Sequence, residues 1–506
     1  MTRINKEGII AHLNELQKVA EPRPHEEILK EILAEVEAVD FEKRAKVDLE
    51  NKLKNPGLTN EQRDKIIKEL GAFRLMEKHS LIITIEEIID LTRRKNWGIC
   101  KNLDFIYLFN GAFWKSIDKE AFQKFLGEAS EKMGVEKFTA KYFRFRANLF
   151  KQFLASEYFP APQKPKDRVC INLLNGTFEI TDKPHLRPFC ARDFTKYQLP
   201  FAYDPEATAP KFTAFLNRVL PEKDKQAVLA ECLGYIFVPH SQLKLEKALF
   251  LFGSGANGKS VLYEIIRALL GNFNTSEYTL QSLTDTNGYY RAMIADKLVN
   301  YASEINGKLD SAKFKSLASG EPLEARLPYG QPMIIEDYAK MIFNTNELPK
   351  DVEFTNAFFR RFVIIPFQVT IPENEQNKNL HKEIIEGELP GVFNWVLEGL
   401  NRLLVQKKFS DCASIDQALD QFKTESDTVK RFLEEEGYRS DPENKILLKE
   451  LYPEYREFAL DDGNRVLSKG NFRKRLEALN IYINRESLGV QVFISKYQEG
   501  NGRAPF

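Results

Sequence analysis

Hydrophobic and polar residues follow two different patterns along the first two hundred residues of this chain. From about residue 5 to residue 94, apolar positions recur at helical spacing among many charged ones, and the pattern breaks at EPRPHEE and KNPGLTNEQRD. In the second break Thr59 precedes Gln62 by three residues, which is the spacing of a capping box. Acidic and basic residues interleave throughout, so this part is predicted to be a solvated helical hairpin or an assembly collar.

Between about residues 96 and 200 the pattern changes to short strands. Runs rich in aromatic and β-branched residues flank Asn110-Gly111 and Asn175-Gly176, which favour tight hairpin turns. A helical block at residues 139–159 lies between these two hairpins, and it mixes cations with aromatic residues: Lys141, Arg144, Arg146 and Lys151 with Tyr142, Phe143, Phe145 and Phe150. Such a mixture can cradle a nucleic-acid single strand, but aromatic residues at helical spacing are more often core, and we favour that interpretation.

After a linker at residues 196–212 and helices at 212–238, the strongest local pattern begins. The apolar run KALFLF is followed by GSGANGKS at residues 253–260 and then by a helical apolar pattern. The loop fits G-x-x-x-x-G-K-[ST] in full and has the strand before it and the helix after it that this motif requires. Inward-pointing N–H groups and the helix N-terminus favour phosphate. We predict a nucleoside triphosphate site formed by Gly253, Ser254, Gly255, Ala256, Asn257, Gly258, Lys259, Ser260 and Val261.

Within this loop, Lys259 would reach the β- and γ-phosphates and Ser260 would ligate Mg²⁺. Kinases, GTPases and motor ATPases share the motif, so later signals decide the class. The strand DKLVNYASEING ends at Glu304, whose carboxylate can accept from a Mg²⁺-bound water and polarise an attacking water. The strand AKMIFNTNELP ends with Asn344 and Asn346, and Asn346 can orient the attacking water.

AFFRRFVIIPF then sets Arg360 and Arg361 before a further strand, where an arginine can serve the γ-phosphate bound by a neighbouring subunit. Each signal also has an ordinary structural explanation: a strand-end acid for Glu304, a turn residue for Asn346, and a solvated strand edge for the arginine pair. Their order after a complete phosphate loop favours catalysis.

These motifs resemble a superfamily 3 helicase, in particular the phage and plasmid primase-helicase group related to the poxvirus primase-helicase. The resemblance rests on GSGANGKS, VNYASE, KFKSLASGEPLEARLPYG, NTNELP and RRFVIIPF in that order, and it covers roughly residues 169–367. It implies an α/β, AAA+-like P-loop ATPase domain in a ring, expected to be a hexamer, which hydrolyses ATP with Mg²⁺ between subunits. It also implies 3′-to-5′ movement on single-stranded and forked DNA during replication of a phage, plasmid or other mobile element.

By position, the resemblance makes Lys259 and Ser260 the phosphate-loop pair and Glu304 the acidic residue of the second motif. Asn346 becomes the polar sensor, and Arg361 or Arg360 the arginine finger. The family also has a pore hairpin that grips DNA. Here a turn at LPYGQP would place Tyr329 near the tip and Arg326 one strand-step away, with Lys313 and Lys315 on the preceding helix. Relatives often carry a lysine at the tip. Tyr329 could instead stack on a base, or simply cover the apolar side of the turn.

The resemblance breaks down at the start of the chain. Relatives often carry a primase domain there, which needs clustered carboxylates for two-metal chemistry. The first hundred residues show no such cluster on a strand and no metal-ligand cysteines, so no primase activity is expected of this chain, and a separate primase is an expected partner.

The C-terminal part, residues 411–506, reads as a helical and α+β module. Three helices and a closing two-stranded ribbon match a winged helix, whose last helix often enters a major groove. Lys469, Arg473, Lys474 and Arg475 make that helix basic. We favour DNA contact over a packing role for these cations. The chain is thus predicted to divide into a helical N-terminal region (1–95), an α+β domain (96–205), the ATPase domain (206–410) and a C-terminal winged-helix-like domain (411–506).

Composition changes this picture little. Lys plus Arg and Asp plus Glu both number 73, so any nucleic-acid contact must come from local basic patches. The five cysteines are far apart and without a C-x-x-C pair, which predicts buried reduced thiols rather than zinc or disulfides. No run approaches the ~20 apolar residues of a membrane span, and the first residues lack a signal-peptide pattern, so a cytoplasmic protein with no membrane partner is expected.

Three functions fit these observations in decreasing order. The first is a ring-forming ATP-dependent DNA helicase. The second is a P-loop ATPase switch or remodeller that acts on protein partners without unwinding. The third, a small-molecule kinase, is disfavoured because nothing resembles a nucleotide-monophosphate lid.

Overall fold

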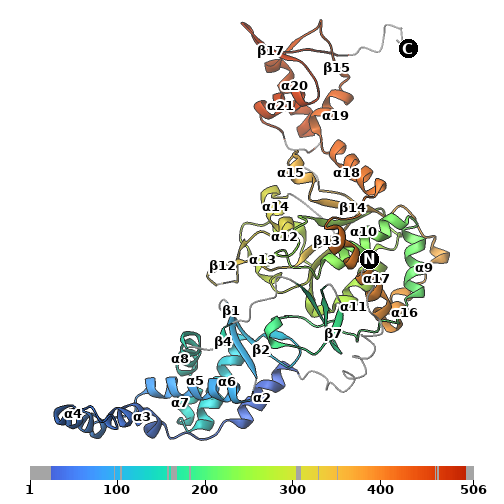
Figure 1. Cartoon of the computed structure of the whole chain (residues 1–506). Coiled ribbons are helices and arrows are strands. Elements are labelled where there is room, and N and C mark those ends of the chain that lie inside the picture. Colours follow the sequence, from blue (N-terminus) through green and yellow to red (C-terminus); the bar gives the residue numbers. More distant parts are fainter. Residues whose placement is uncertain are drawn as a thin grey trace. The chain divides into compact units, whose positions relative to one another are not determined.

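The computed structural model describes residues 24–95, 97–102, 105–156, 159–160, 168–181, 184–303, 309–328, 330–349, 352–461, 463 and 466–496. The chain divides into two compact units, Met1–Tyr203 and Asp204–Phe506 (Figure 1). Their boundary falls inside the segment that the sequence predicts to be a linker. The finer division into four parts stays a prediction.

The first unit contains two small sheets, with helices before and between their strands. Its helices are α2 (His25–Glu35), α3 (Phe41–Leu53), α4 (Asn60–Gly71), α5 (Glu77–Arg94), α6 (Lys119–Met133), α7 (Lys137–Lys141), α8 (Phe143–Ala155) and the short η1 (Ala191–Asp193). Its strands are β1 (Gly98–Asn102), β2 (Phe105–Phe109), β3 (Trp114–Ser116), β4 (Phe159–Pro160), β5 (Val169–Leu173), β6 (Gly176–Ile180) and β7 (His185–Arg187). The sheets have the orders β3-β2-β1-β4 and β5-β6-β7.

Local sequence signals in this unit are confirmed. The Thr59 side chain accepts from Gln62 N while the Gln62 side chain accepts from Thr59 N, which completes the capping box of α4. Asn110 and Gly111 turn the chain between β2 and β3, and the Asn110 side chain accepts from the N–H groups of Ala112 and Phe113. Gly176, with a φ of 146°, begins β6 directly after the second predicted turn.

The aromatic residues of α7 and α8 follow the core prediction only in part. Phe145 and Phe150 are buried, together with Phe122, in the core beneath α5, α6 and α8. Tyr142 and Phe143 are exposed, so the core interpretation was wrong for these two residues. These two residues lie at the bend between α7 and α8, where the helix is interrupted, rather than on the buried face.

The second unit is an α/β structure with further small sheets. Its helices are α9 (Pro210–Val219), α10 (Lys223–Tyr235), α11 (Lys259–Leu270), η2 (Asn272–Asn274), α12 (Leu280–Leu283), α13 (Tyr289–Met293), α14 (Ser311–Ser319), α15 (Asn356–Phe359), η3 (Glu373–Glu375), α16 (Leu380–Gly387), α17 (Leu389–Gln406), α18 (Ala413–Glu425), α19 (Thr428–Glu435), α20 (Leu448–Asp461) and α21 (Lys469–Ala478). Its strands are β8 (Ala248–Phe252), β9 (Thr275–Ser276), β10 (Val299–Ser303), β11 (Leu323–Arg326), β12 (Pro332–Ile335), β13 (Lys340–Thr345), β14 (Phe362–Pro366), β15 (Tyr438–Ser440), β16 (Ile446–Leu447), β17 (Ile483–Glu486), β18 (Gly489–Val492) and β19 (Ile494–Lys496).

Five of these strands form a parallel sheet in the order β14-β8-β13-β10-β9. The strands β8, β13 and β14 are almost continuously buried, which is why their sequences read as unbroken apolar runs. After β8 the chain crosses to the far edge at β9, returns through β10 and β13, and passes β8 to form β14. Strand β8, which lies between β14 and β13, is therefore the point where the chain changes direction across the sheet, and its carboxyl end is where ligands bind in such folds.

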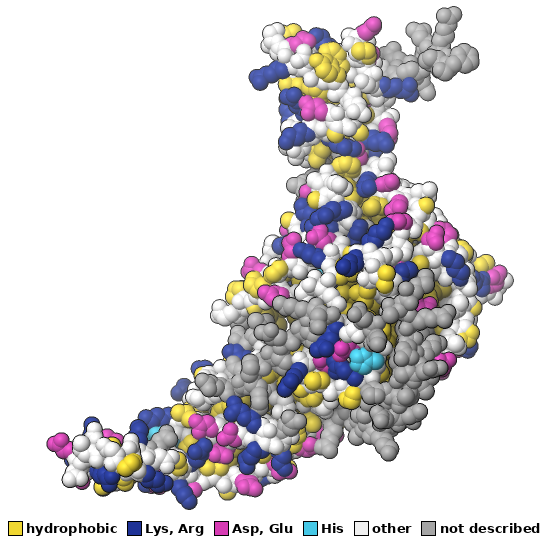
Figure 2. Space-filling model, in the orientation of Figure 1, with side chains coloured by type: hydrophobic (Ala, Val, Ile, Leu, Met, Phe, Trp, Pro, Cys, Tyr) yellow, Lys and Arg dark blue, Asp and Glu magenta, His cyan; other side chains and the backbone are white. Residues whose placement is uncertain are grey.

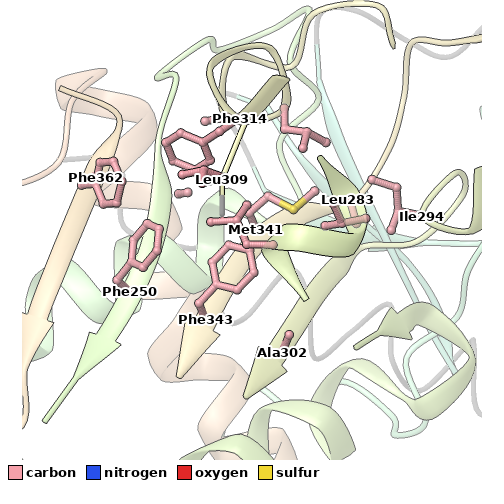
Figure 3. Close-up of a cluster of buried hydrophobic side chains, with 14 of the residues drawn as sticks. Phe250, Leu283, Ile294, Ala302, Leu309, Phe314, Met341, Phe343 and Phe362 are labelled. Atoms are coloured by element: carbon pink, nitrogen blue, oxygen red, sulfur yellow. The ribbon is translucent and has the colours of Figure 1, made fainter. Parts of the chain in front are cut away.

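One face of this sheet is covered by an aromatic cluster. Phe250, Phe343 and Phe362 come from three neighbouring strands and lie side by side, with Phe314 of α14 over them (Figure 3). The rings of Phe250 and Phe362 stack at a centroid distance of 4.5 Å. This packing holds β8 between its two neighbours, and so fixes the ends of three strands relative to one another.

Helices α10 and α17 pack with almost no space between their backbones. A Cβ atom added at Gly234 would lie 2.8 Å from the Cα of Leu400, and one added at Gly399 would lie 2.4 Å from the carbonyl carbon of Ala230. Both contacts are shorter than any side chain could tolerate. The pair of glycines therefore sets the distance between these two helices.

The last part of the unit has its own core. Helices α19, α20 and α21 enclose Phe432, Leu451, Tyr455, Phe472 and Leu476, and the rings of Tyr455 and Phe472 stack at 4.4 Å. The hairpin β17–β18 follows the last helix, with β16 pairing on its other side. The predicted three helices and closing ribbon are therefore present.

The cysteines, the apolar character of the helices and the surface charges were predicted from composition. All five cysteines are free, but Cys190 is exposed and Cys170 half-buried, so burial was predicted wrongly for these two. Among the described residues no helix has both the length and the apolar character needed to cross a membrane. In the same residues, no three or more His, Cys, Asp or Glu side chains gather as a metal site. Lys and Arg side chains are scattered among Asp and Glu over the face seen in Figure 2.

Candidate nucleotide-binding site at the end of the parallel sheet

The loop between β8 and α11 folds into a tight cradle. Gly253 lies next to the segment that follows β14: a Cβ there would meet the carbonyl oxygen of Phe367 at 2.3 Å. Gly258 begins α11 with a φ of 86°, and a Cβ there would lie 2.7 Å from Val219. Only glycine fits both positions, which explains the two glycines that the motif fixes. Ala256 also has a positive φ of 57° and so carries local strain.

The Asn257 side chain and two backbone groups hold this loop in shape. Asn257 is buried, and its Nδ2 donates to the carbonyl oxygens of Ser254 and Phe367, the latter at 3.3 Å. Ile371 N donates to the Ala256 carbonyl at 2.8 Å. The segment after β14 thus forms one wall of the loop. Sequence reasoning missed Phe367 and Ile371, because they act through backbone groups, which leave no residue signature.

Lys259 is the charged group inside the cradle. Its Nζ donates to the carbonyl oxygens of Gly253 at 2.5 Å and Ser254 at 3.2 Å, and to Asn257 Oδ1 at 3.1 Å. The side chain is buried, and burial lowers the pKa of this amine from its ordinary value. These three acceptor oxygen atoms are all neutral. The ammonium is therefore a strong partner for an anion that enters the loop.

The end of β13 supplies a second polar group to the same place. Asn346 is exposed, and its Oδ1 accepts from Lys259 Nζ at 3.3 Å. Asn344 instead is buried, where its Oδ1 accepts from the Tyr301 hydroxyl at 2.9 Å and its Nδ2 contacts the Lys259 carbonyl oxygen at 3.5 Å. Of the two asparagines, Asn346 therefore faces the loop interior, and Asn344 supports the first turn of α11.

The other predicted loop residues lie where an anion or cation could be reached. Ser254, Gly255, Ala256 and Ser260 are exposed, and Val261 is half-buried in the first turn of α11. The hydroxyl-bearing Ser260 follows Lys259 at the helix N-terminus, where the helix dipole favours negative charge. Glu304 comes directly after β10 and lies outside the described residues, as does Tyr329.

Arg360 and Arg361 have opposite environments. The Arg361 side chain is buried: its Nε donates to Lys315 O at 3.1 Å and to Ser319 Oγ at 3.0 Å, and its Nη1 donates to the Ala357 carbonyl. The Arg360 side chain is 55% exposed and pairs with Glu246 at 2.6 Å. Arg361 thus anchors α15 to α14, while Arg360 points outward.

The predicted hairpin is confirmed as β11–β12, with Arg326 opposite Pro332. Arg326 lies over the Tyr289 ring and donates to the Tyr289 hydroxyl at 2.9 Å. Lys315 pairs with Glu353 at 2.8 Å, and Lys313 Nζ donates to the Asp285 carbonyl at 2.5 Å. The described basic groups near this hairpin thus already hold partners within the chain.

On the last helix, α21, some cations are exposed to solvent and others form ion pairs within the chain. Lys469 and Lys474 are exposed. Arg473 forms an ion pair with Glu477 one turn away, at 2.9 Å. Arg475 lies 2.5 Å from the buried carboxylate of Asp427 and is itself half-buried, so its charge is paired within this module.

Two protein families match parts of the chain. The family described as "D5 N terminal like" matches residues 86–221, and a family of unknown function, DUF5906, matches residues 251–361. The second match begins in β8 and ends at Arg361, and so contains the phosphate loop and the arginine pair.

Known proteins are similar at greater distance. "Putative helicase L207/L206" of Acanthamoeba polyphaga mimivirus is 25% identical over 232 residues, which cover 42% of this chain and 23% of that protein. The chain thus corresponds to less than a quarter of this relative. The apo structure of the NrS-1 C terminal region in its A form covers 81% of this chain and 99% of its own, at 14% identity and a TM-score of 0.45. A second apo structure of that region (305–718) gives 13% identity and a TM-score of 0.43.

Proposed function

We propose that the chain is an ATP-dependent DNA helicase that acts in the replication of a phage, plasmid or other mobile element. The observation that carries the proposal is the meeting of Lys259 and Asn346 inside the glycine-rich loop, at the carboxyl end of β8. An ammonium for the phosphates and an amide for the attacking water are the two groups that such hydrolysis needs from neighbouring strands. The similarity to a viral protein named as a helicase supports the same class.

The loop fits ATP with Mg²⁺. Its two fixed glycines allow the tight turn of the backbone that would surround the phosphates, and Lys259 presents its charge inside that turn. In this proposal residues 253–261 hold the nucleotide, and Ser260 with Glu304 holds the metal. Mg²⁺ would neutralise phosphate charge when bound. The strand order, with β8 between β13 and β14, supports an AAA+-like ATPase of the kind that the sequence motifs resemble.

Hydrolysis at a subunit interface is the second element of the proposal. Arg360 is the better arginine finger, because its side chain is 55% exposed although it pairs with Glu246, whereas the buried Arg361 donates to Ser319 and Ala357. A ring of identical subunits, expected to be a hexamer with 3′-to-5′ polarity, follows from the resemblance. The winged-helix-like module with Lys469 and Lys474 would add duplex contacts that depend on salt but not on sequence.

A strand-displacement assay on forked DNA tests the proposal. Forks with only a 3′ tail or only a 5′ tail are compared, with ATP and Mg²⁺ and with the Lys259→Ala variant as control. The proposal expects ATP-dependent displacement from one tail polarity and none by the variant. ATP hydrolysis that ignores DNA and displaces no strand would instead favour a nucleotide-driven switch acting on protein partners.

A further inference from the structure

The bend between α7 and α8 exposes three aromatic rings on the first unit. Phe138, Tyr142 and Phe143 have exposed fractions of 79%, 48% and 68%. The rings of Tyr142 and Phe143 are neighbours, with centroids 5.0 Å apart at 67°. Exposed apolar side chains that occur singly need no explanation, whereas three aromatic residues within six positions form a patch that indicates a binding surface.

The backbone holds these rings outward. Tyr142 is both the C-cap residue of α7 and the N-cap residue of α8, and its backbone is extended. Glu136 begins α7 by accepting from Phe138 N at 2.9 Å and Thr139 N at 2.8 Å. Arg146 Nε donates to the carbonyl oxygen of the buried Ala140 at 3.1 Å. The bend is thus fixed from both sides, and its exposed rings do not depend on a loose loop.

Three exposed cations belong to the same stretch of chain as the rings. Lys137, Lys141 and Arg144 are exposed, and the Arg144 guanidinium lies 5.7 Å from the centre of the Phe143 ring. Two acids on α6 and at the start of α7 are engaged: Glu136 caps α7, and Glu131 lies 4.0 Å from Lys141. An apolar protein partner would bury these cations without supplying an opposite charge. A single nucleic-acid strand offers flat base faces for the rings and phosphates for the cations.

We propose that this surface, formed by Lys137, Phe138, Lys141, Tyr142, Phe143 and Arg144, binds single-stranded DNA outside the phosphate-loop site. The choice of DNA as the strand rests on the proposed function. Bases stack on Phe143 and Phe138 without regard to sequence, and the cations contact the connecting phosphates. Duplex DNA is a poor ligand here, because its base faces are covered by neighbouring base pairs.

The test measures binding of a fluorescent oligothymidylate to the full chain without nucleotide. Phe138→Ala and Phe143→Ala are each expected to weaken binding about tenfold. Phe273→Ala is the matched control, because this ring is 86% exposed and lies in the other unit, and it should leave the affinity unchanged. Lys141→Ala should lower the dependence of binding on salt by about one unit of slope, whereas the ring variants should not change it.

A reporter on the surface itself separates this contact from other DNA contacts. In the Phe143→Trp variant, the added indole fluorescence should fall when unlabelled oligothymidylate binds and should not change with a duplex of equal length. Phe273→Trp provides the background. Undiminished indole fluorescence of the Phe143→Trp variant at saturating oligothymidylate, or equal affinities for wild type and both alanine variants of the rings, would overturn the proposal. So would a response to the duplex as large as the response to the single strand.

The fluorescence response at position 143 does not depend on the proposed ATP-driven activity. When Phe143→Trp is combined with Lys259→Ala, the fluorescence response should persist, since the assay contains no nucleotide. A chain that shows quenching at position 143 but does not hydrolyse ATP would retain this surface and lose the proposed helicase function. A chain that unwinds forks without any response at position 143 would do the reverse.

Discussion

The Nζ atom of Lys259, at the start of α11, lies 3.3 Å from Oδ1 of Asn346, which follows the end of β13. The two residues are 87 positions apart in the chain, and the parallel pairing of β8 with β13 brings them together. An amide oxygen holds an ammonium without neutralising it, so Lys259 keeps the positive charge that the proposed phosphate site requires.

Replacing Lys259 by alanine should abolish ATP hydrolysis. The variant loses the only cation among the described residues of the loop, and removal of one such electrostatic partner costs on the order of 10²–10³ in rate. Phosphate release measures the effect, with Lys244→Ala as a control on an exposed lysine of the same unit. A variant that hydrolysed ATP within a few fold of wild type would remove Lys259 from the reaction.

Changing Asn346 to aspartate should weaken nucleotide binding without lowering thermal stability. A carboxylate at this position would pair with Lys259 and repel phosphate, so nucleotide affinity should fall about tenfold or more while the free chain unfolds at an equal or higher temperature. Asn346→Ala should bind nucleotide normally but hydrolyse it slowly. Nucleotide titration followed by thermal unfolding checks both, and equal nucleotide affinities in the two variants would contradict the assigned geometry.

The two neighbouring arginines should respond in opposite ways. Arg361→Ala removes several buried hydrogen bonds and should cost about 2–4 kcal/mol of unfolding free energy. Arg360→Ala should change stability by no more than about 0.5 kcal/mol. Denaturant unfolding measures both.

Activity in mixtures completes the comparison of the arginines. Arg360→Ala subunits mixed with wild type should lower hydrolysis below the average of the two activities, because each alanine disables a neighbour's site. An activity that falls only in proportion to the mixture would argue against hydrolysis between subunits.

Stability should fall in mild acid because of His240. Burial, together with the nearby charge of Lys340, lowers the pKa of His240 from 6.5 to about 3. Its nitrogen atoms lie 3.0 Å from Lys340 Nζ, and Asp337 opposes the shift. Between these two pH values His240 therefore binds a proton in the unfolded chain but not in the folded chain. The free energy of unfolding should decline as pH falls from about 6.5 toward 3, by at most about 1.4 kcal/mol per pH unit.

Comparison with His240→Gln checks this assignment. Unfolding by denaturant is measured at several pH values between 7 and 4, and the variant should lose part of the pH slope although it is less stable throughout. Burial also lowers the pKa of Lys340, which adds a slope of the same sign at higher pH. An unchanged slope between pH 6.5 and 4 would assign the acid sensitivity to other groups.

The cations of α21 should divide between DNA contact and folding. Lys469→Ala with Lys474→Ala should reduce the salt dependence of duplex binding by about two units of slope and leave thermal unfolding unchanged. Arg475→Ala should cost about 3–5 kcal/mol, because it leaves the buried Asp427 carboxylate unpaired. Binding across a salt series and thermal unfolding distinguish the two. A double lysine variant with wild-type salt dependence would return these residues to ordinary solvation.

The sequence allows good predictions where one short segment decides the structure. The turns at Asn110-Gly111 and Asn175-Gly176, the capping box at Thr59 and the hairpin β11–β12 are set by residues within a few positions of one another. The loop before Lys259 belongs to the same class, since its glycines are required by the backbone itself.

The sequence decides less where the environment is built by distant segments. Arg360 and Arg361 are chemically identical, and only the packing of α14 against α15 makes one internal. Tyr142 and Phe145 share one aromatic pattern, yet a bend in the backbone exposes the first and buries the second. Periodicity assumes a continuous helix, and a bend at Tyr142 breaks that assumption.

The glycine contacts between α10 and α17 constrain how this unit can move. Helices that touch through their backbones have no side-chain layer in which small shifts can be absorbed, so sliding of one against the other would require them to separate. A rearrangement that accompanies the proposed nucleotide turnover must then move both helices together as one rigid body. The hinges would lie in the connecting segments on either side of the pair.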